Sequence, residues 1–220
     1  MKNLEIYIHI PFCVRKCEYC DFLSFPADDD AKLRYVKGLM AEMIFYGPLM
    51  KNYQVSSVYI GGGTPSSIDE QWIAALIEGV FDCFNVLPDA EISIECNPGT
   101  LSREKLLAYR DAGINRLSIG LQSANNDELK QLGRIHTFEQ FVTNYEVARN
   151  VGFKNINVDL MYGLPGQSAS QYMATVNKII RLHPDHISAY SLIVEKGTPF
   201  YEKYKFDMVR QEAGMRTEFL

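Results

Sequence analysis

Short apolar runs alternate with longer amphipathic segments along the whole chain. The short runs are rich in β-branched and aromatic residues and predict strands, at residues 4–10, 56–62, 90–96, 115–123, 155–163 and 186–194. The longer segments repeat their apolar positions at helical spacing and predict helices, at residues 27–47, 67–84, 102–113, 126–132, 137–151 and 168–183. Ser67 or Asp69 is the expected N-cap of the second of these helices.

This alternation of strand and helix determines the fold class that we expect. Parallel strands joined by crossover helices form a sheet that the helices cover. We therefore expect an α/β fold, an incomplete (β/α)6 barrel of parallel strands with outer helices. No low-complexity segment or linker divides the 220 residues. We expect a core barrel over residues 1–200 and, over 201–220, the start of a following C-terminal helical region that is cut short at MRTEFL.

The segments that follow the predicted strands share an unusual composition. In barrels of parallel strands, functional residues gather where the strands end. Glycine, proline and polar residues concentrate at those positions here, in the stretches CVRKCEYC, GGGTPS, ECNPGT, GLQS, DLMYGLPGQ and SLIVEKGTPF. The sequence therefore predicts a functional site along this rim of the barrel.

Charge and hydropathy narrow the class of protein. The net charge is −5, so no basic surface indicates a nucleic-acid partner. No apolar run is long enough to span a membrane, and the first residues lack the pattern of a signal peptide. We therefore expect a cytoplasmic protein. Of the five cysteines, Cys83 and Cys96 stand alone in apolar surroundings and are expected to be buried.

The other three cysteines, Cys13, Cys17 and Cys20, have the spacing C-x3-C-x2-C. A cubane iron–sulfur cluster is usually held by four thiolates, so three thiolates leave one iron free to bind a small chelating molecule. Zinc is an alternative, with His9 as a fourth ligand. A redox C-x-x-C pair beside a bystander cysteine is another.

The stretch YIHIPFCVRKCEYCDF, in which Tyr19 precedes the third cysteine, resembles the radical S-adenosylmethionine (SAM) superfamily. Within it, the stretch is similar to the oxygen-independent coproporphyrinogen III oxidases and their HemW relatives. The resemblance implies a barrel of the radical SAM type and a [4Fe–4S] cluster on Cys13, Cys17 and Cys20. It further implies SAM on the open iron and an electron donor such as flavodoxin or ferredoxin.

The same resemblance implies contacts to SAM at residues along the predicted rim. Gly62, Gly63 and Thr64 of GGGTPS match the segment that contacts the methionine amino group. Further implied cofactor contacts are Tyr7, Tyr19, Glu95, Gln122, Arg134, Asp159 and Ile193. Structural roles remain open for some of them, since Arg134 could pair with an acid and Asp159 could cap a loop.

One residue after the cysteine motif separates two branches of the family. The oxidases carry a further cysteine two residues after the third, where this chain has Phe22. The form CDF is typical of the HemW branch, so the resemblance favours a haem chaperone. Such a protein binds haem or porphyrin and delivers haem to acceptor proteins, with peripheral membrane association through an acceptor.

Two alternative functions remain, and enzymatic activity is left open. The first is an oxidase that decarboxylates coproporphyrinogen III to protoporphyrinogen IX in haem biosynthesis. The second is a non-catalytic iron–sulfur redox sensor. The haem-associated H-N-x-Y-W motif of the HemW branch does not occur in these 220 residues, whose histidines are His9, His136, His183 and His186. His9 is a candidate for porphyrin contact or for a hydrogen bond to the backbone.

Overall fold

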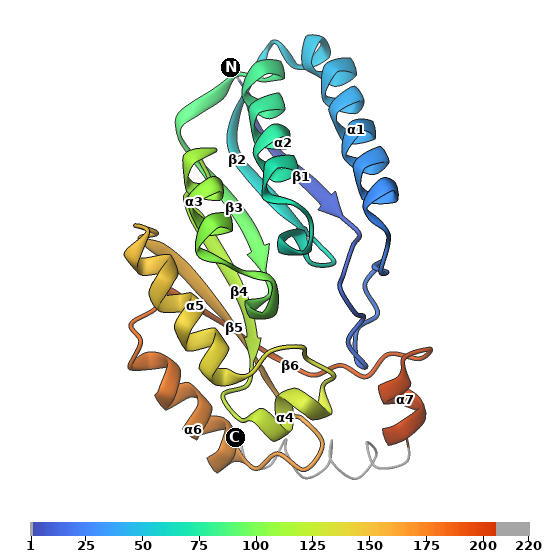
Figure 1. Cartoon of the computed structure of the whole chain (residues 1–220), viewed down its shortest axis with the longest axis vertical. Coiled ribbons are helices and arrows are strands. Elements are labelled where there is room, and N and C mark those ends of the chain that lie inside the picture. The colour runs from blue at the N-terminus through green and yellow to red at the C-terminus, as the bar shows by residue number, and fades with distance from the viewer. Residues whose placement is uncertain (1, 206–220) are drawn as a thin grey trace.

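The computed structural model describes residues 2–205, which fold around one sheet of parallel strands (Figure 1). The strands lie side by side in the order in which they occur along the chain. They are β1 (Lys2–Ile10), β2 (Tyr53–Gly62), β3 (Val86–Cys96), β4 (Arg116–Gln122), β5 (Asn155–Tyr162) and β6 (His186–Ser191). The expected incomplete (β/α)6 barrel is confirmed, and all its strands end at the same rim.

Helices follow the strands, and most of them cover the outer side of the sheet, whereas two short ones lie at the end where the strands finish (Figure 1). They are α1 (Asp29–Tyr46), α2 (Glu70–Cys83), α3 (Arg103–Asp111), α4 (Asn126–Gln131), α5 (Phe138–Asn150), α6 (Ala169–Ile180) and α7 (Pro199–Tyr204). Short 3-10 helices, which the sequence did not predict, are η1 (Gly47–Met50), η2 (Pro65–Ser67) and η3 (Pro98–Thr100). Within residues 2–205, no helix combines the length and the apolar character that crossing a membrane requires.

Side-chain caps explain where the helices begin. The Asp28 carboxylate accepts a hydrogen bond from the first turn of α1, and Asp69, one of the two expected caps, does the same for α2. Helix α5 begins with a capping box, in which Thr137 and Gln140 each bind the other's backbone N–H. These polar residues satisfy backbone N–H groups of the first turn and so set the residue at which each helix begins.

The main core lies between the sheet and its helices and contains alternate residues of each strand, including Ile60 and Ile94. A second, smaller core lies below the rim, where Phe200 of α7 packs against Leu132, Met161 and Leu164. The Phe200 N–H also donates to the Glu18 carbonyl in the cysteine-containing loop, at 3.0 Å. Helix α7 overlaps the start of the helical region expected from residue 201 and spans the proposed boundary at residue 200.

Several boundaries differ from those predicted. Helix α6 ends at Ile180 rather than near 183, because His183 adopts a left-handed conformation with φ of 52° ahead of Pro184. Strand β6 ends at Ser191 rather than 194, and β3 begins early, where Val86 pairs with Val55 of β2. Cys96 is buried as expected, whereas Cys83 is half-buried. The helix predicted near MRTEFL lies outside the described residues.

Candidate functional site

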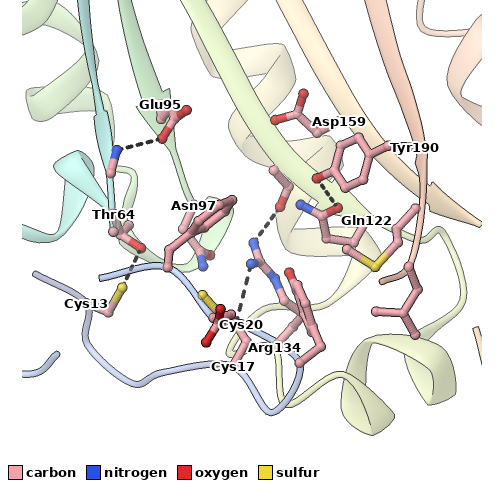
Figure 2. A pocket seen from close by; sticks show the side chains of 18 of the residues that line it. Cys13, Cys17, Cys20, Thr64, Glu95, Asn97, Gln122, Arg134, Asp159 and Tyr190 are labelled. Carbon is pink, nitrogen blue, oxygen red and sulfur yellow. Dashed lines mark hydrogen bonds between the residues drawn. The ribbon is translucent and has the colours of Figure 1, made fainter. Parts of the chain in front are cut away.

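A pocket of about 360 Å³ opens where the strands end, and each strand contributes to its walls either directly or through the segment that follows it (Figure 2). Every predicted site residue except Tyr7 and His9 lines this pocket. The cysteines lie along one side, and the carboxyl groups of Glu95 and Asp159 lie across from them (Figure 2). The tertiary fold therefore gathers residues that are far apart in sequence around one volume.

The three cysteines are held by a loop between β1 and α1. The backbone N–H of Cys13 donates to Phe25 at 3.1 Å, and that of Cys20 donates to the Cys17 carbonyl at 3.2 Å. The Cys13 sulfur lies 3.3 Å from the Thr64 hydroxyl. All three thiols are half-buried, so they face the pocket without being sealed from it.

The three thiols line one pocket, as the ligands of a shared iron–sulfur cluster would. Within residues 2–205, no group of three His, Cys, Asp or Glu side chains converges as the ligands of one ion would. His9, the candidate fourth zinc ligand, instead hydrogen-bonds to the Tyr7 hydroxyl and the Leu23 carbonyl. A cubane cluster places each thiolate at a different corner, so its ligands stand apart around a shared volume.

The glycine loop after β2 packs closely against the cysteine loop. The N–H groups of Gly63 and Thr64 donate to the carbonyls of Ile10 and Phe12, each at 2.8 Å. A Cβ on Gly63 would lie 2.8 Å from the Phe12 oxygen and 3.1 Å from the Cys13 sulfur. Only glycine therefore allows this close approach, which leaves room for a cluster and its ligand at Cys13.

Glu95 and Asp159 are half-buried carboxyl groups held by specific donors. The Tyr59 hydroxyl donates to Glu95 at 2.8 Å, and the Gly62 N–H donates to the other Glu95 oxygen at 3.1 Å. Asp159 accepts from the Asn157 amide at 2.7 Å and from the Ser118 hydroxyl at 3.2 Å. Burial raises the pKa of both carboxyl groups. Such groups can accept hydrogen bonds from hydroxyl or ammonium groups of a ligand.

Arg134 and Gln122 line the wall between the cysteines and the acids. Arg134 Nη2 donates to the Gly120 carbonyl at 2.6 Å, and Nη1 lies 3.6 Å from the Cys17 sulfur. Arg134 forms no ion pair with any residue in 2–205, so the alternative role as a partner of an acid finds no support. Asp159 lies inside β5 rather than at a loop cap. The Tyr190 hydroxyl donates to Gln122 Oε1 at 2.9 Å.

The remaining predicted residues occupy different positions. Tyr19 lines the pocket, and its ring meets Phe200 edge-on at 6.4 Å. Ile193 lies at the pocket mouth with 67% of its surface exposed. Tyr7 is exposed on β1, where its ring stacks on Tyr59 and its hydroxyl binds His9, so the structure does not bring Tyr7 into the pocket.

Sequence reasoning missed several residues that line the pocket, including Asn97, Ser118 and Tyr190. Ser118 lies on the same side of β4 as Gln122, because alternate residues of a strand face the same way. Asn97 belongs to the ECNPGT stretch, two residues after Glu95. Extending the search four residues back from Gln122 and two residues on from Glu95 would have found both of these. Tyr190 carried no comparable signal.

Comparison with known families agrees with this geometry. Residues 7–179 match the radical SAM superfamily. The chain belongs to the radical SAM superfamily. Membership implies a [4Fe–4S] cluster and SAM, and the three thiols with the facing polar wall fit both groups.

Curated relatives indicate which branch of the radical SAM superfamily this chain resembles. It is 40% identical to the haem chaperone HemW of Bacillus subtilis (strain 168) over 196 residues, which cover 89% of this chain and 52% of that protein. It is 39% identical to HemW of Escherichia coli (strain K12) over 203 residues, with 90% and 52% covered. The chain thus spans about half the length of the curated relatives it matches.

A solved structure shares the fold. The coproporphyrinogen III oxidase HemN of Escherichia coli superimposes with a TM-score of 0.81 and 27% sequence identity. The match covers 96% of this chain and 53% of that enzyme. The resemblance to the HemN and HemW family that the cysteine motif indicated is confirmed, with the HemW relatives favoured by identity.

Proposed function

We propose that this chain is the radical SAM portion of a HemW-type haem chaperone. Two observations support the HemW branch: the identity to HemW proteins of two bacteria, and Phe22 in place of the further cysteine of the oxidases. The proposal includes a [4Fe–4S] cluster, SAM and haem or porphyrin as ligands. It also includes an electron donor such as flavodoxin or ferredoxin, haem-acceptor proteins and a cytoplasmic setting, in which thiols stay reduced.

The observation that carries the proposal is that one pocket holds three thiols together with residues at the positions that the family resemblance implies for SAM contact. Cys13, Cys17 and Cys20 would hold the cluster, and the glycine loop would approach the amino-acid part of SAM. Glu95 and Asp159 present hydrogen-bonded carboxyl groups across the pocket. A bare redox sensor would not need this second wall, so the sensor alternative explains less of the site.

The residues of this chain have separate tasks in that proposal. When bound, the cluster and SAM would supply one-electron chemistry that breaks a carbon–sulfur bond of SAM. The cysteine loop binds and partly buries the thiolates, and the Arg134 guanidinium adds positive charge beside Cys17. The core around Phe200 closes the floor next to Tyr19 and excludes water from that side.

The ligand assignment can be tested by anaerobic reconstitution of cysteine variants. Cys13→Ala, Cys17→Ala and Cys20→Ala are each expected to abolish cluster binding, measured as bound iron and sulfide and by electron paramagnetic resonance (EPR). Cys83→Ala is the matched control, because Cys83 ends α2 and does not line the pocket. An alanine variant at 13, 17 or 20 that keeps the full cluster signal would overturn the assignment.

A second experiment separates the chaperone from the oxidase. The reconstituted chain receives SAM, a reductant and coproporphyrinogen III, and a parallel sample is titrated with haem beside HemW of Bacillus subtilis. We expect no protoporphyrinogen IX, and its formation would overturn the proposal in favour of the oxidase. Haem binding by the chain supports the chaperone. Binding only by the longer relative would place the haem contact in the half that this chain does not match.

A further inference from the structure

Gln122 has an unusual backbone conformation at the end of β4. Its φ angle is 74°, in the left-handed region that residues with a Cβ rarely adopt. The pairing of β4 with β5 shifts at this point, so that Gly120 lies opposite Asp159 and Gln122 opposite Leu160. Such conformations persist only where surrounding contacts impose them, and they occur often at functional sites.

A buried carboxyl group is hydrogen-bonded to Ser123, the residue that follows Gln122. Glu128 of α4 has 7% of its surface exposed, and its Oε2 accepts hydrogen bonds from the Ser123 hydroxyl and from Gln167 Nε2, the latter at 2.9 Å. Gln167 Oε1 in turn accepts from the Gly163 N–H at 3.1 Å. The loop after β4 and the loop after β5 are thereby tied to one carboxylate.

This arrangement is costly, which argues that it does more than fill space. Glu128 Oε1 is buried and finds no hydrogen-bond partner among the described residues. A buried acceptor without a partner normally destabilises a fold, so its presence calls for an explanation. Glu128, with its unsatisfied oxygen, follows the left-handed Gln122 by only six residues. Ser123 connects them, because it is bonded to Gln122 along the chain and donates a hydrogen bond to Glu128.

The left-handed backbone of Gln122 accompanies a fixed position of its side chain in the pocket. Gln122 has 5% of its surface exposed, and the Tyr190 hydroxyl holds its Oε1 at 2.9 Å. No residue in 2–205 accepts a hydrogen bond from Gln122 Nε2. The amide N–H groups therefore remain as donors toward the pocket, next to Arg134 and Asp159 (Figure 2).

We propose that Glu128, through Ser123 and Gln167, is a positioning residue that holds Gln122 in its left-handed conformation and so directs the Gln122 amide at an acceptor atom of bound SAM. The identity of that ligand rests on the proposed function. The holding of the backbone does not, and it can be measured without any ligand.

The first test reads the backbone of residue 122 in the 220-residue chain. Gln122→Gly and Gln122→Ala both remove the amide, but only glycine adopts a positive φ without strain. With Glu128 present, the glycine variant should melt about 2 to 4 °C above the alanine variant. With Glu128→Ala added, that difference should vanish, because residue 122 can leave the left-handed region.

Controls separate this effect from general destabilisation. Leu129→Ala removes a buried apolar neighbour of Glu128 on α4 and should lower the melting temperature without changing the glycine–alanine difference. Gln167→Ala removes one of the two hydrogen bonds to Glu128 and should reduce the glycine–alanine difference. It serves as the test variant if the Glu128→Ala chain does not fold. An undiminished difference in both Glu128→Ala and Gln167→Ala chains would overturn the proposal.

The second test measures SAM affinity of the chain with its cluster. Glu128→Ala should weaken SAM binding about tenfold when Gln122 is present and should have no further effect in a Gln122→Ala chain. Equal losses in both chains would refute the directed amide. If the unmutated chain does not bind SAM, the proposed function fails, and the melting test alone decides whether Glu128 holds Gln122.

Discussion

At the scale of single residues, Arg134 shows how the fold places a charge beside the candidate sulfur ligands. Its guanidinium contacts the Cys17 sulfur and the Gly120 carbonyl, and its Nε is buried and has no partner among residues 2–205. Positive charge and N–H donors near a cluster thiolate favour the reduced, more negative state. We therefore expect Arg134 to affect how readily a cluster on these cysteines is reduced.

Replacing Arg134 tests this electrostatic role without SAM. Arg134→Met is expected to lower the reduction potential of the cluster on the order of 50 mV, the one-electron equivalent of about 1 kcal/mol. The potential is measured by redox titration followed by EPR. Arg103→Met, which removes an exposed arginine of α3, is the control and should leave the potential unchanged. Equal potentials in both variants would contradict the role.

At the scale of elements, His136 connects the ends of two neighbouring strands. Its Nδ1 lies 3.1 Å from Asn97 Oδ1, just after β3, and its Nε2 lies 3.3 Å from the Leu121 carbonyl in β4. Burial, with a smaller contribution from the Arg134 charge, lowers the pKa of His136 to about 3. The imidazole is therefore neutral in the folded protein at all moderately acidic pH values.

This shift predicts a specific pH dependence of stability. Below the ordinary histidine pKa of about 6.5, the unfolded chain binds a proton that the folded chain does not. The free energy of unfolding therefore falls as pH drops from about 6.5 toward 3, by up to about 1.4 kcal/mol per unit. His136→Gln should flatten this dependence in urea unfolding curves at about pH 7, 6 and 5.

The difference between the unmutated chain and the His136→Gln chain gives the contribution of His136 to the pH dependence of stability. Glu95 and Asp159 have raised pKa values, so their folded forms hold protons more readily and their contribution to stability has the opposite sign. Both carboxyl groups remain in the variant, and their contribution cancels in the difference. Parallel pH profiles for the two chains would show that His136 does not stay neutral in the fold.

At the scale of the whole molecule, α7 links the last described residues back to the first loop. Phe200 is fully buried against the loops after β4 and β5, and its N–H binds the Glu18 carbonyl between Cys17 and Tyr19. The segment that follows β6 therefore contacts the cysteine loop that follows β1. The boundary at residue 200 between two regions stays a prediction, and α7 packs with the residues before it.

Truncating the Phe200 side chain should lower both the free energy of unfolding and the amount of cluster bound. Phe200→Ala is expected to lower the free energy of unfolding by about 3 to 5 kcal/mol, because it leaves a large cavity under the cysteine loop. Bound iron after reconstitution should fall as well. Lys203→Ala, on the exposed side of α7, is the control. Loss of stability with unchanged cluster loading would separate α7 from the site.

Much of the fold and some of the site could be predicted from local patterns. Alternation along strands, helical spacing and caps such as Asp69 act over a few residues, so the order of strands and helices followed from the sequence. The spacing of Cys13, Cys17 and Cys20 likewise placed three sulfurs on one short loop. These features depend on backbone geometry and near neighbours, which a sequence displays directly.

The rest was decided by contacts between distant segments. Only the packed barrel brings Arg134 to the Cys17 sulfur, holds Gln122 left-handed above Glu128, and leaves Tyr7 outside the pocket. Helix α7 forms because a buried site for Phe200 exists among loops that come from other parts of the chain. The sequence alone determined the kinds of elements and the candidate sulfur ligands, whereas register, packing and curvature of the sheet decided which side chains meet.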